Sequence, residues 1–245
     1  MDVHKDEHMK QDSFYLTCER YYIFELLIFA GGMLGAYTYN LRGGVFCNAQ
    51  TANVVLMSLR FGKGEFKEGL YYLIPITAYL LGAVVSEVLP VRVRRFRFLR
   101  WDSYLVAFEI AVLFVLGFVP LDISFQHMIQ VIVNFLASMQ YNTFRQAEGV
   151  PMATTFVTNH IRQTGIWLVE YLVKRDRAAG RRCFRHLRMI AVFFAGGMVL
   201  TALCDRFQEK VVWLILPPLM IVVGILAHAD LHSEHEKLAQ KPRGH

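Results

Sequence analysis

The feature that most constrains this fold is a series of long apolar runs spaced along the whole chain. A helix needs about 20 mostly apolar residues to cross the ~30 Å hydrocarbon core of a bilayer. Four runs contain no Asp, Glu, Lys or Arg, and two others hold one glutamate each. The runs are residues 21–40, 69–86, 103–121, 123–144, 189–204 and 211–229. We therefore predict an all-α membrane protein with about six transmembrane helices.

The composition argues against an ordinary soluble domain. Hydrophobic residues make up 55% of the chain and charged residues 19%, whereas about 25% is usual for charged residues in soluble domains. The net charge is +6 and the pI is near 9.2. Because the basic residues cluster directly beside apolar runs, we interpret them as cytoplasmic loops, and we expect no nucleic-acid partner.

Two further stretches, residues 47–61 and 152–173, do not fit an ordinary span. The first is short and rich in small polar residues. The second carries Arg162, which would cost at least a few kcal/mol deep in lipid. We expect both stretches to be re-entrant, interfacial or broken rather than simple crossings.

Positive charge predicts the topology. Arginine clusters occupy residues 91–100 and 174–188, and such clusters are retained in the cytoplasm. Counting the spans between them puts both ends of 152–173 on the cytoplasmic face. If 47–61 also fails to cross, both termini are cytoplasmic.

The two irregular stretches resemble each other. Gly44-Val45 precedes a run that reaches Thr51, and Gly149-Val150 precedes a run that reaches Thr158. The predicted topology gives them opposite orientations. We therefore predict two inverted repeats of three helices each, a recurrent plan of transporters with interrupted helices near the membrane midplane. The predicted divisions are a cytosolic tail at 1–13, repeats at 14–121 and 122–231, and a second cytosolic tail at 232–245.

Polar residues within these regions are the candidate substrate-binding site. The set comprises Thr51, Asn53, Glu109, Asn134, Thr154, Thr155 and Thr158. Hydroxyls and amides where broken helices begin suit a polar midplane site, although capping and small-residue packing need the same residues. Glu109 lies mid-span, where a carboxyl group serves either proton coupling or a structural pairing. Asn134 belongs to a polar face that lines a water path or forms interhelical hydrogen bonds.

Other groups of residues are candidates for contact with lipid or metal. Basic side chains beside the spans favour contact with anionic lipid headgroups of the surrounding bilayer, and the candidates are Arg92, Arg94, Arg95, Arg97, Arg181 and Arg182. His228, His232 and His235 have a spacing that could bind a metal, but their polar tail favours solvated side chains. The four cysteines form no C-x-x-C pair. We predict no catalytic residue, metal site or cofactor, since no nucleophile, zinc or nucleotide motif is present.

The motifs resemble those of the YoaK family, bacterial polytopic membrane proteins that carry a domain of unknown function. Residues 153–158, Ala-Thr-Thr-Phe-Val-Thr, are similar to that family's Ala-Thr-Thr-aromatic-Val-Thr-Gly run. Gly44-Val45-Phe46 and Thr51-Ala52-Asn53 resemble its Gly-Val-Phe and Thr-Gly-Asn elements. The resemblance extends from about Glu25 to Ala229 and implies a multi-pass protein of the bacterial cell (inner) membrane.

The chain departs from the family pattern in places. The family's Gly-x-x-Asp-Ala becomes Gly32-Met33-Leu34-Gly35-Ala36, which lacks the acid. If that acid carries an ion or proton in relatives, this chain has lost it or uses Glu25 or Glu109 instead.

Three functional classes follow from these observations. The first is a small-solute transporter or channel with its path between the two repeats. The second is a non-transporting scaffold, assembly or lipid-binding protein, and the third is a membrane enzyme acting on lipid, which would need an acid near Thr51. The sequence fixes neither a substrate nor whether the chain forms a homo-oligomer.

Overall fold

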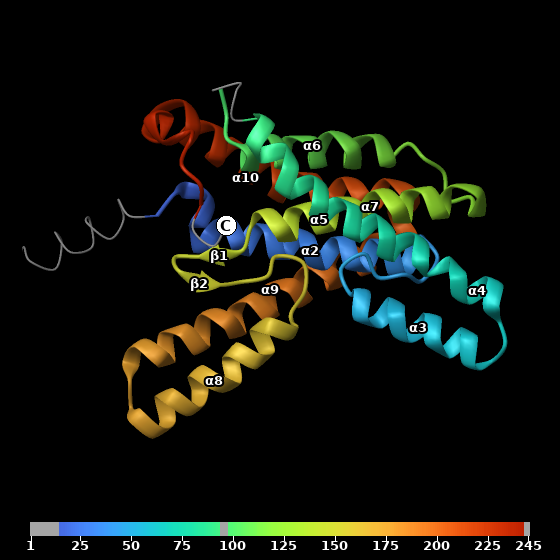
Figure 1. Ribbon diagram of the computed structural model, residues 1–245, viewed down its shortest axis with the longest axis horizontal. Helices are drawn as coiled ribbons and strands as arrows, with labels where there is room; N and C mark the ends of the chain where they lie inside the picture. Colours follow the sequence, from blue (N-terminus) through green and yellow to red (C-terminus); the bar gives the residue numbers. More distant parts are fainter. Residues whose placement is uncertain (1–14, 94–97, 243–245) are drawn as a thin grey trace, which may run out of the picture.

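The computed structural model describes residues 15–93 and 98–242, and 79% of it is helical (Figure 1). The predicted tail at 1–13 and Arg94, Arg95 and Arg97 lie outside the described residues. The long helices are α2 (Tyr21–Leu41), α5 (Leu73–Val93), α6 (Trp101–Leu116), α7 (Ile123–Thr143), α9 (Arg177–Phe207) and α10 (Leu216–His228). The shorter elements are η1 (Thr17–Glu19), α3 (Gln50–Gly62), α4 (Phe66–Tyr71), β1 (Gln146–Ala147), β2 (Val150–Pro151), α8 (Thr158–Lys174), η2 (Gln208–Ile215), the π-helix η3 (Ala229–Ser233) and η4 (His235–Lys237).

The long helices run back and forth along the longest axis of the molecule (Figure 1). The starts of α2 and α6, the end of α7 and the end of α10 lie at one end, on the left of the figure. The two-stranded β1–β2 hairpin and the α8–α9 turn lie at that end as well. The α3–α4 turn lies at the other end.

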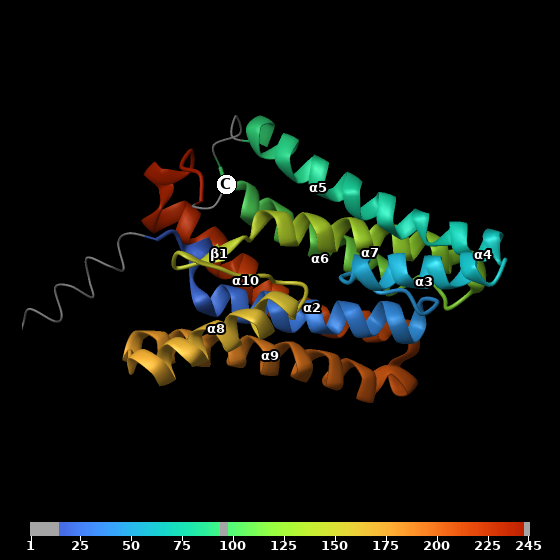
Figure 2. The ribbon, with the colours of Figure 1, turned by 60° about the horizontal axis from the view of Figure 1, so that its bottom comes forward.

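The bundle is built from helix pairs. Helix α2 packs along α9, α5 packs along α7, and α6 packs against α10. Figure 2 shows α9 and α5 on opposite outer sides, with α2 and α7 between them. Small residues on α2 and α9 permit the close approach. A Cβ added at Gly32 would overlap the carbonyl oxygen of Phe193, and one at Gly196 would overlap that of Phe29.

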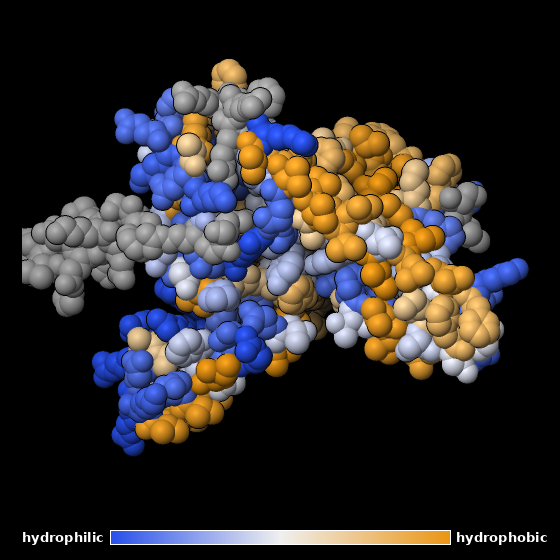
Figure 3. Space-filling view, in the orientation of Figure 1, coloured by the Kyte–Doolittle hydropathy of each residue, from blue (hydrophilic) through white to orange (hydrophobic). Residues whose placement is uncertain are grey.

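The outer surface of the bundle is apolar. Leu80 is 62% exposed, and Phe194 on the opposite side is 68% exposed. Apolar surface covers much of the bundle, whereas hydrophilic side chains gather toward the end with the β-hairpin (Figure 3). Exposed apolar area on this scale is foreign to soluble monomers. The apolar helices are those of a membrane protein.

Three helical stretches of the described chain are long and apolar enough to cross a membrane: Tyr21–Leu41, Phe66–Arg92 and Arg177–Ser233. The third stretch contains both α9 and α10, so these three include four of the six predicted spans. Of the remaining two, α6 has only 16 residues and α7 carries several amide side chains.

Two helix starts, those of α9 and α10, lie five or more residues from the starts of the predicted runs. The predicted loop at 174–188 is largely helical, because α9 begins at Arg177 and runs for 31 residues. The Asp176 side chain caps the start of α9 by accepting a hydrogen bond from the backbone N–H of Ala178. A search for apolar runs does not detect such a capping residue. The predicted span at 211–229 opens instead as the 3-10 helix η2, and α10 starts with Pro217 and Pro218 in its first turn.

Candidate functional site

The first irregular stretch follows α2 and leads into α3. Gly43 and Gly44 have φ angles of 84° and 71°, which suit glycine and reverse the chain. Helix α3 then runs for 13 residues, about 20 Å, which is too short to cross a bilayer alone. At its start, the Asn53 side chain donates to the Phe46 carbonyl at 2.8 Å and to Oε1 of Gln50 at 3.0 Å.

The second irregular stretch follows α7 and leads into α8. Glu148 and Gly149, with φ angles of 47° and 79°, form the turn of the β-hairpin. The chain then bends at Thr154 and Thr155 before α8 begins, and both side chains are fully buried. His160 in the first turn of α8 contacts the carbonyl oxygen of Ala153 at 2.8 Å, which holds this non-helical segment against the helix.

Both stretches meet one turn of α2. The Asn48 side chain donates to the carbonyl oxygen of Gly31 at 3.2 Å, and a Cβ at Gly35 would crowd the same amide. A Cβ at Gly31 would overlap the Thr154 carbonyl oxygen and lie 3.1 Å from the Cα of Thr155. The glycines of α2 therefore bring together two segments that lie more than one hundred positions apart in the chain.

Helix α7 supplies a third wall. Gln130 and Asn134 are one helical turn apart and fully buried, and the Asn134 side chain donates to the Gln130 carbonyl oxygen at 2.8 Å. Oδ1 of Asn134 accepts from the Gln50 amide at 2.8 Å, which links α7 directly to the start of α3. The Gln130 side chain also donates to the carbonyl oxygen of Arg42.

Several buried polar atoms in this region have no hydrogen-bond partner among the described residues. They are Asn53 Oδ1, Gln130 Oε1, Ser138 Oγ, Gln140 Oε1 and Thr154 Oγ1. Thr155 Oγ1 also lacks a partner within hydrogen-bonding geometry, although the Tyr79 side chain lies close to it. Few buried polar atoms lack a hydrogen bond in native proteins, so each exception needs an explanation. No charged side chain belongs to the group. The arrangement can therefore hydrogen-bond an uncharged or partly dehydrated polar ligand.

Side-chain capping does not explain these hydroxyls. The N-cap of α3 is Ala49 and that of α8 is Val157, and neither helix start receives a side-chain cap. The free backbone N–H groups of a helix start attract an electronegative group. The threonines and the two helix starts are thus available for another polar partner.

The structure brings together only part of the predicted site. Asn53, Asn134, Thr154 and Thr155 line the buried centre described above. Thr51 and Thr158 are exposed at the starts of α3 and α8. Glu109 on α6 is 2% exposed, and neither of its carboxylate oxygens has a hydrogen-bond partner among the described residues. Among the described residues, Glu109 forms no hydrogen bond with the other six.

The predicted site leaves out several residues of the centre, and Gln130 of α7 is one of them. Asn48 and Gln50 lie between Gly44-Val45 and Thr51, and their position at the start of a short helix is the available signal. Tyr79 of α5 neighbours Thr155 and Cys47, but nothing in the sequence of α5 distinguishes it from a packing tyrosine. In the tail, the rings of His228 and His232 stack at 4.5 Å between centroids, and the described residues contain no group of three or more potential metal ligands.

The family of the chain can now be stated. The sequence pattern of DUF1275, described as a protein of unknown function, matches residues 23–225. The chain belongs to the DUF1275 family. The resemblance to YoaK proteins is confirmed, since YoaK is a DUF1275 family. The DUF1275 match includes both irregular stretches and the α2 glycines. No curated protein and no solved structure matches this DUF1275 chain.

Proposed function

We propose that this protein is a transporter or channel for a small polar solute, and that the solute binds where the two irregular stretches meet. The observation that carries the proposal is the buried group of unpaired hydroxyl and amide oxygens around Asn53, Thr154 and Thr155. Non-helical backbone at membrane depth is tolerated only where it is buried in protein or lines a cavity. A solute with both donors and acceptors would satisfy these atoms.

The proposal includes a six-span fold of two inverted repeats. If α2, α3, α5 and α6 correspond in order to α7, α8, α9 and α10, the helix pairs exchange with one another. The α2–α9 pair becomes the α7–α5 pair, and the α6–α10 pair maps onto itself, as a two-fold axis requires. The pairs also share a detail: Gly196 abuts the Phe29 carbonyl oxygen, and Gly82 abuts that of Phe135.

The irregular stretches support the same correspondence. Each opens with two consecutive residues of positive φ, Gly43-Gly44 and Glu148-Gly149. Each then leads into a helix that runs toward the end of the bundle at which the preceding long helix stops (Figure 1). The two helices point to opposite ends of the bundle, as inverted repeats demand.

The proposed orientation places both termini in the cytoplasm of a bacterial cell. The end of the bundle with both described chain ends also holds the α8–α9 turn and the basic half of α9 (Figure 1). Basic loops remain on the cytoplasmic side. The α3–α4 turn then faces the outside.

The binding centre is closed in this structure, since the Asn53, Thr154 and Thr155 side chains are all fully buried. Transport therefore requires the stretches to separate from α2. Glu109 is proposed as a proton-coupling group apart from the centre. Its buried, unpaired carboxyl group fits the usual role of an intramembrane acid facing a pathway.

The test is uptake into proteoliposomes across a panel of small metabolites, comparing wild type with Thr155→Val. Thr77→Val is the matched control, because its hydroxyl only donates to the Ile74 carbonyl oxygen on an exposed face. We expect the wild-type protein to transport at least one solute. Thr155→Val is expected to reduce that flux about tenfold or more, which corresponds to a loss of about 1.4 kcal/mol of binding free energy. The control variant is expected to transport at the wild-type rate. Correctly inserted protein without flux for any solute would contradict the proposal.

The close packing of the centre also favours the second candidate, a non-transporting scaffold. In that case the glycine contacts and buried amides only fix the helices. Wild-type liposomes would then show no flux, while partner proteins would crosslink through the arginine-rich loops.

A further inference from the structure

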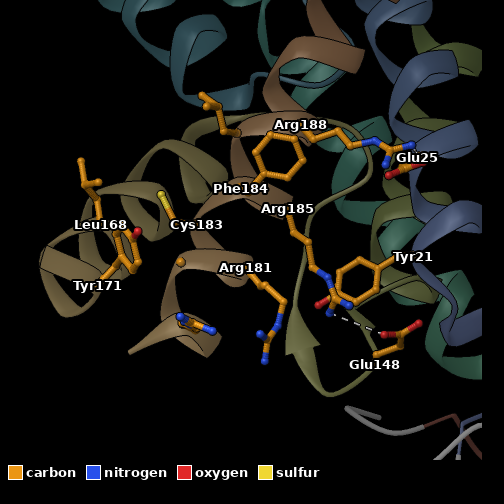
Figure 4. A pocket seen from close by; sticks show the side chains of 13 residues that line it. Tyr21, Glu25, Glu148, Leu168, Tyr171, Arg181, Cys183, Phe184, Arg185 and Arg188 are labelled. Carbon is orange, nitrogen blue, oxygen red and sulfur yellow. Dashed lines mark hydrogen bonds and ion pairs between the residues drawn. The ribbon is translucent and has the colours of Figure 1, made fainter. Parts of the chain in front are cut away.

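A second candidate site lies away from the buried centre, between the α8–α9 hairpin, the start of α2 and the β1–β2 turn (Figure 4). The cavity there has a volume of about 970 Å³, at the upper end of the range of ligand pockets. Its charged lining comprises Arg177, Arg181, Arg185, Arg188, Glu25 and Glu148. Arginines outnumber glutamates, so the cavity is positively charged.

Two of the arginines are neutralised within the protein. Arg188 pairs with Glu25 at 2.8 Å, and Arg185 pairs with Glu148 at 3.6 Å. Arg185 also lies over the Tyr21 ring, with its guanidinium carbon 3.9 Å from the ring centroid. Arg177 and Arg181 form no ion pair with any residue in 15–93 or 98–242. The surplus charge is therefore concentrated on these two exposed side chains.

The opposite wall of the cavity is apolar. Leu168 and Tyr171 come from α8, and Phe184 and Leu187 from α9. All four are at least 44% exposed, and Phe184 reaches 64%. Figure 4 shows Phe184 and Tyr171 on one side of α9 and Arg185 and Glu148 on the other. A ligand filling this space has an anionic part and an apolar part.

The cavity lies at the boundary between the basic and apolar halves of α9. Arg188 lines it, and the residues from Met189 to Cys204 that follow carry no charge. Such a boundary marks the depth of the lipid headgroups. An amphiphile from the adjacent leaflet can reach the cavity from there.

We propose that this cavity binds the headgroup of an anionic phospholipid. Arg177 and Arg181 hold the phosphate, since one guanidinium group can donate two parallel hydrogen bonds to phosphate oxygens. An acyl chain of the lipid then lies along Phe184 and Leu187. Arg181 is one of the arginines predicted from the sequence to contact headgroups, and the proposal locates that contact in this cavity. Arg182 instead lies over the Trp167 ring at 4.6 Å and does not line the cavity.

The experiment titrates purified protein with dioleoyl phosphatidylglycerol or dioleoyl phosphatidylcholine and counts bound lipid by native mass spectrometry. The variant is Arg177→Gln/Arg181→Gln. The charge-matched control is Arg162→Gln/Arg175→Gln, which removes two exposed arginines of the same hairpin outside the cavity. Each arginine near an anionic surface contributes about 1 kcal/mol, so we expect about 30-fold weaker phosphatidylglycerol binding in the variant and little change in the control.

A second readout uses Cys183, which is half-buried and lines the cavity. Bound phosphatidylglycerol is expected to slow maleimide labelling of Cys183 in wild type and in the control, but not in the variant. Equal loss of binding in both double variants would overturn the proposal, as would equal protection by phosphatidylcholine. Protection by inorganic phosphate alone, matching that by phosphatidylglycerol, would also overturn it, because the site would then bind a free anion. None of these readouts depends on transport.

Discussion

The backbone N–H of Arg100 donates a 2.9 Å hydrogen bond to Oδ2 of Asp230, and this bond ties the start of α6 to η3, which directly follows α10. The same oxygen accepts from the Ser103 hydroxyl at 2.6 Å. The Arg100 side chain donates to Asp102 at 3.1 Å and to the Cys18 sulfur at 3.3 Å. One buried cluster thus joins three distant parts of the chain.

Replacing Asp230 by Ala is expected to destabilise the fold by about 3 kcal/mol, because it removes one partner from a buried charge cluster. The midpoint of thermal unfolding in detergent measures the effect. Asp205→Ala, at an exposed carboxylate, is the control and is expected to leave the midpoint unchanged. Equal midpoints for both variants would show that the cluster contributes nothing.

Gly31→Ala is expected to separate the second irregular stretch from α2. The new methyl group would overlap the backbone of Thr154, and overpacking of this kind costs roughly 1–3 kcal/mol. Gly165→Ala is the control, because no atom lies within 4 Å of a Cβ at that helical position. Since alanine favours helices, the control is expected to unfold at the same or a higher temperature. A variant Gly31→Ala that is as stable as the control would contradict the close approach.

Glu109→Gln is expected to leave stability unchanged or to increase it. Neither carboxylate oxygen has a partner among the described residues, so the neutral amide loses no bond and avoids any burial of charge. Thermal unfolding tests this directly. In the transport assay, the same variant is expected to lose dependence on a pH gradient while retaining passive exchange. A large loss of stability would instead indicate a paired, structural carboxylate.

The long helices could be predicted because their signal is local: the length of an apolar run. The prediction placed the start of the first span at residue 21, and α2 begins at Tyr21. It placed α9 too late, because the cap at Asp176 and the basic first half of the helix are not apolar. The bond between Arg100 and Asp230 joins positions 130 residues apart, and no local pattern indicates such a partner.

The candidate site likewise contains some residues that a local sequence pattern indicates and others that only the tertiary packing determines. Thr154 and Thr155 lie in a non-helical segment that packs against Gly31 of α2, and both are fully buried. In α3, however, Thr51 and Asn53 are two positions apart, and residues at that spacing lie on nearly opposite helix faces. Only Asn53 faces the centre. Which face packs inward depends on α2 and α7, which the sequence of α3 does not reveal.

The cysteines are expected to differ sharply in reactivity. Burial raises the pKa of the Cys18 thiol well above its usual value, and the nearby Asp102 carboxylate raises it further. A raised pKa keeps the thiol protonated at neutral pH, and the thiolate is the reactive form. Timed maleimide labelling, read by mass spectrometry, is expected to modify the half-buried Cys183 at least about tenfold faster than Cys18 at pH 7. Labelling of Cys18 is expected only as the pH rises far above the ordinary thiol range or after unfolding. Equal rates in the folded protein would contradict the buried cluster.

The opposed orientation of α3 and α8 is expected to appear in labelling from the two sides of the membrane. In a Cys183→Ser background, Lys63→Cys places a thiol at the end of α3, and Lys174→Cys places one at the end of α8. Both positions are exposed. A membrane-impermeant maleimide added to intact cells is expected to modify Lys63→Cys alone, and to modify Lys174→Cys only after the membrane is opened. The Cys183→Ser parent controls for the buried native thiols. Labelling of both variants from the same side would show that the two halves are not inverted, and the proposed path between them would lose its basis.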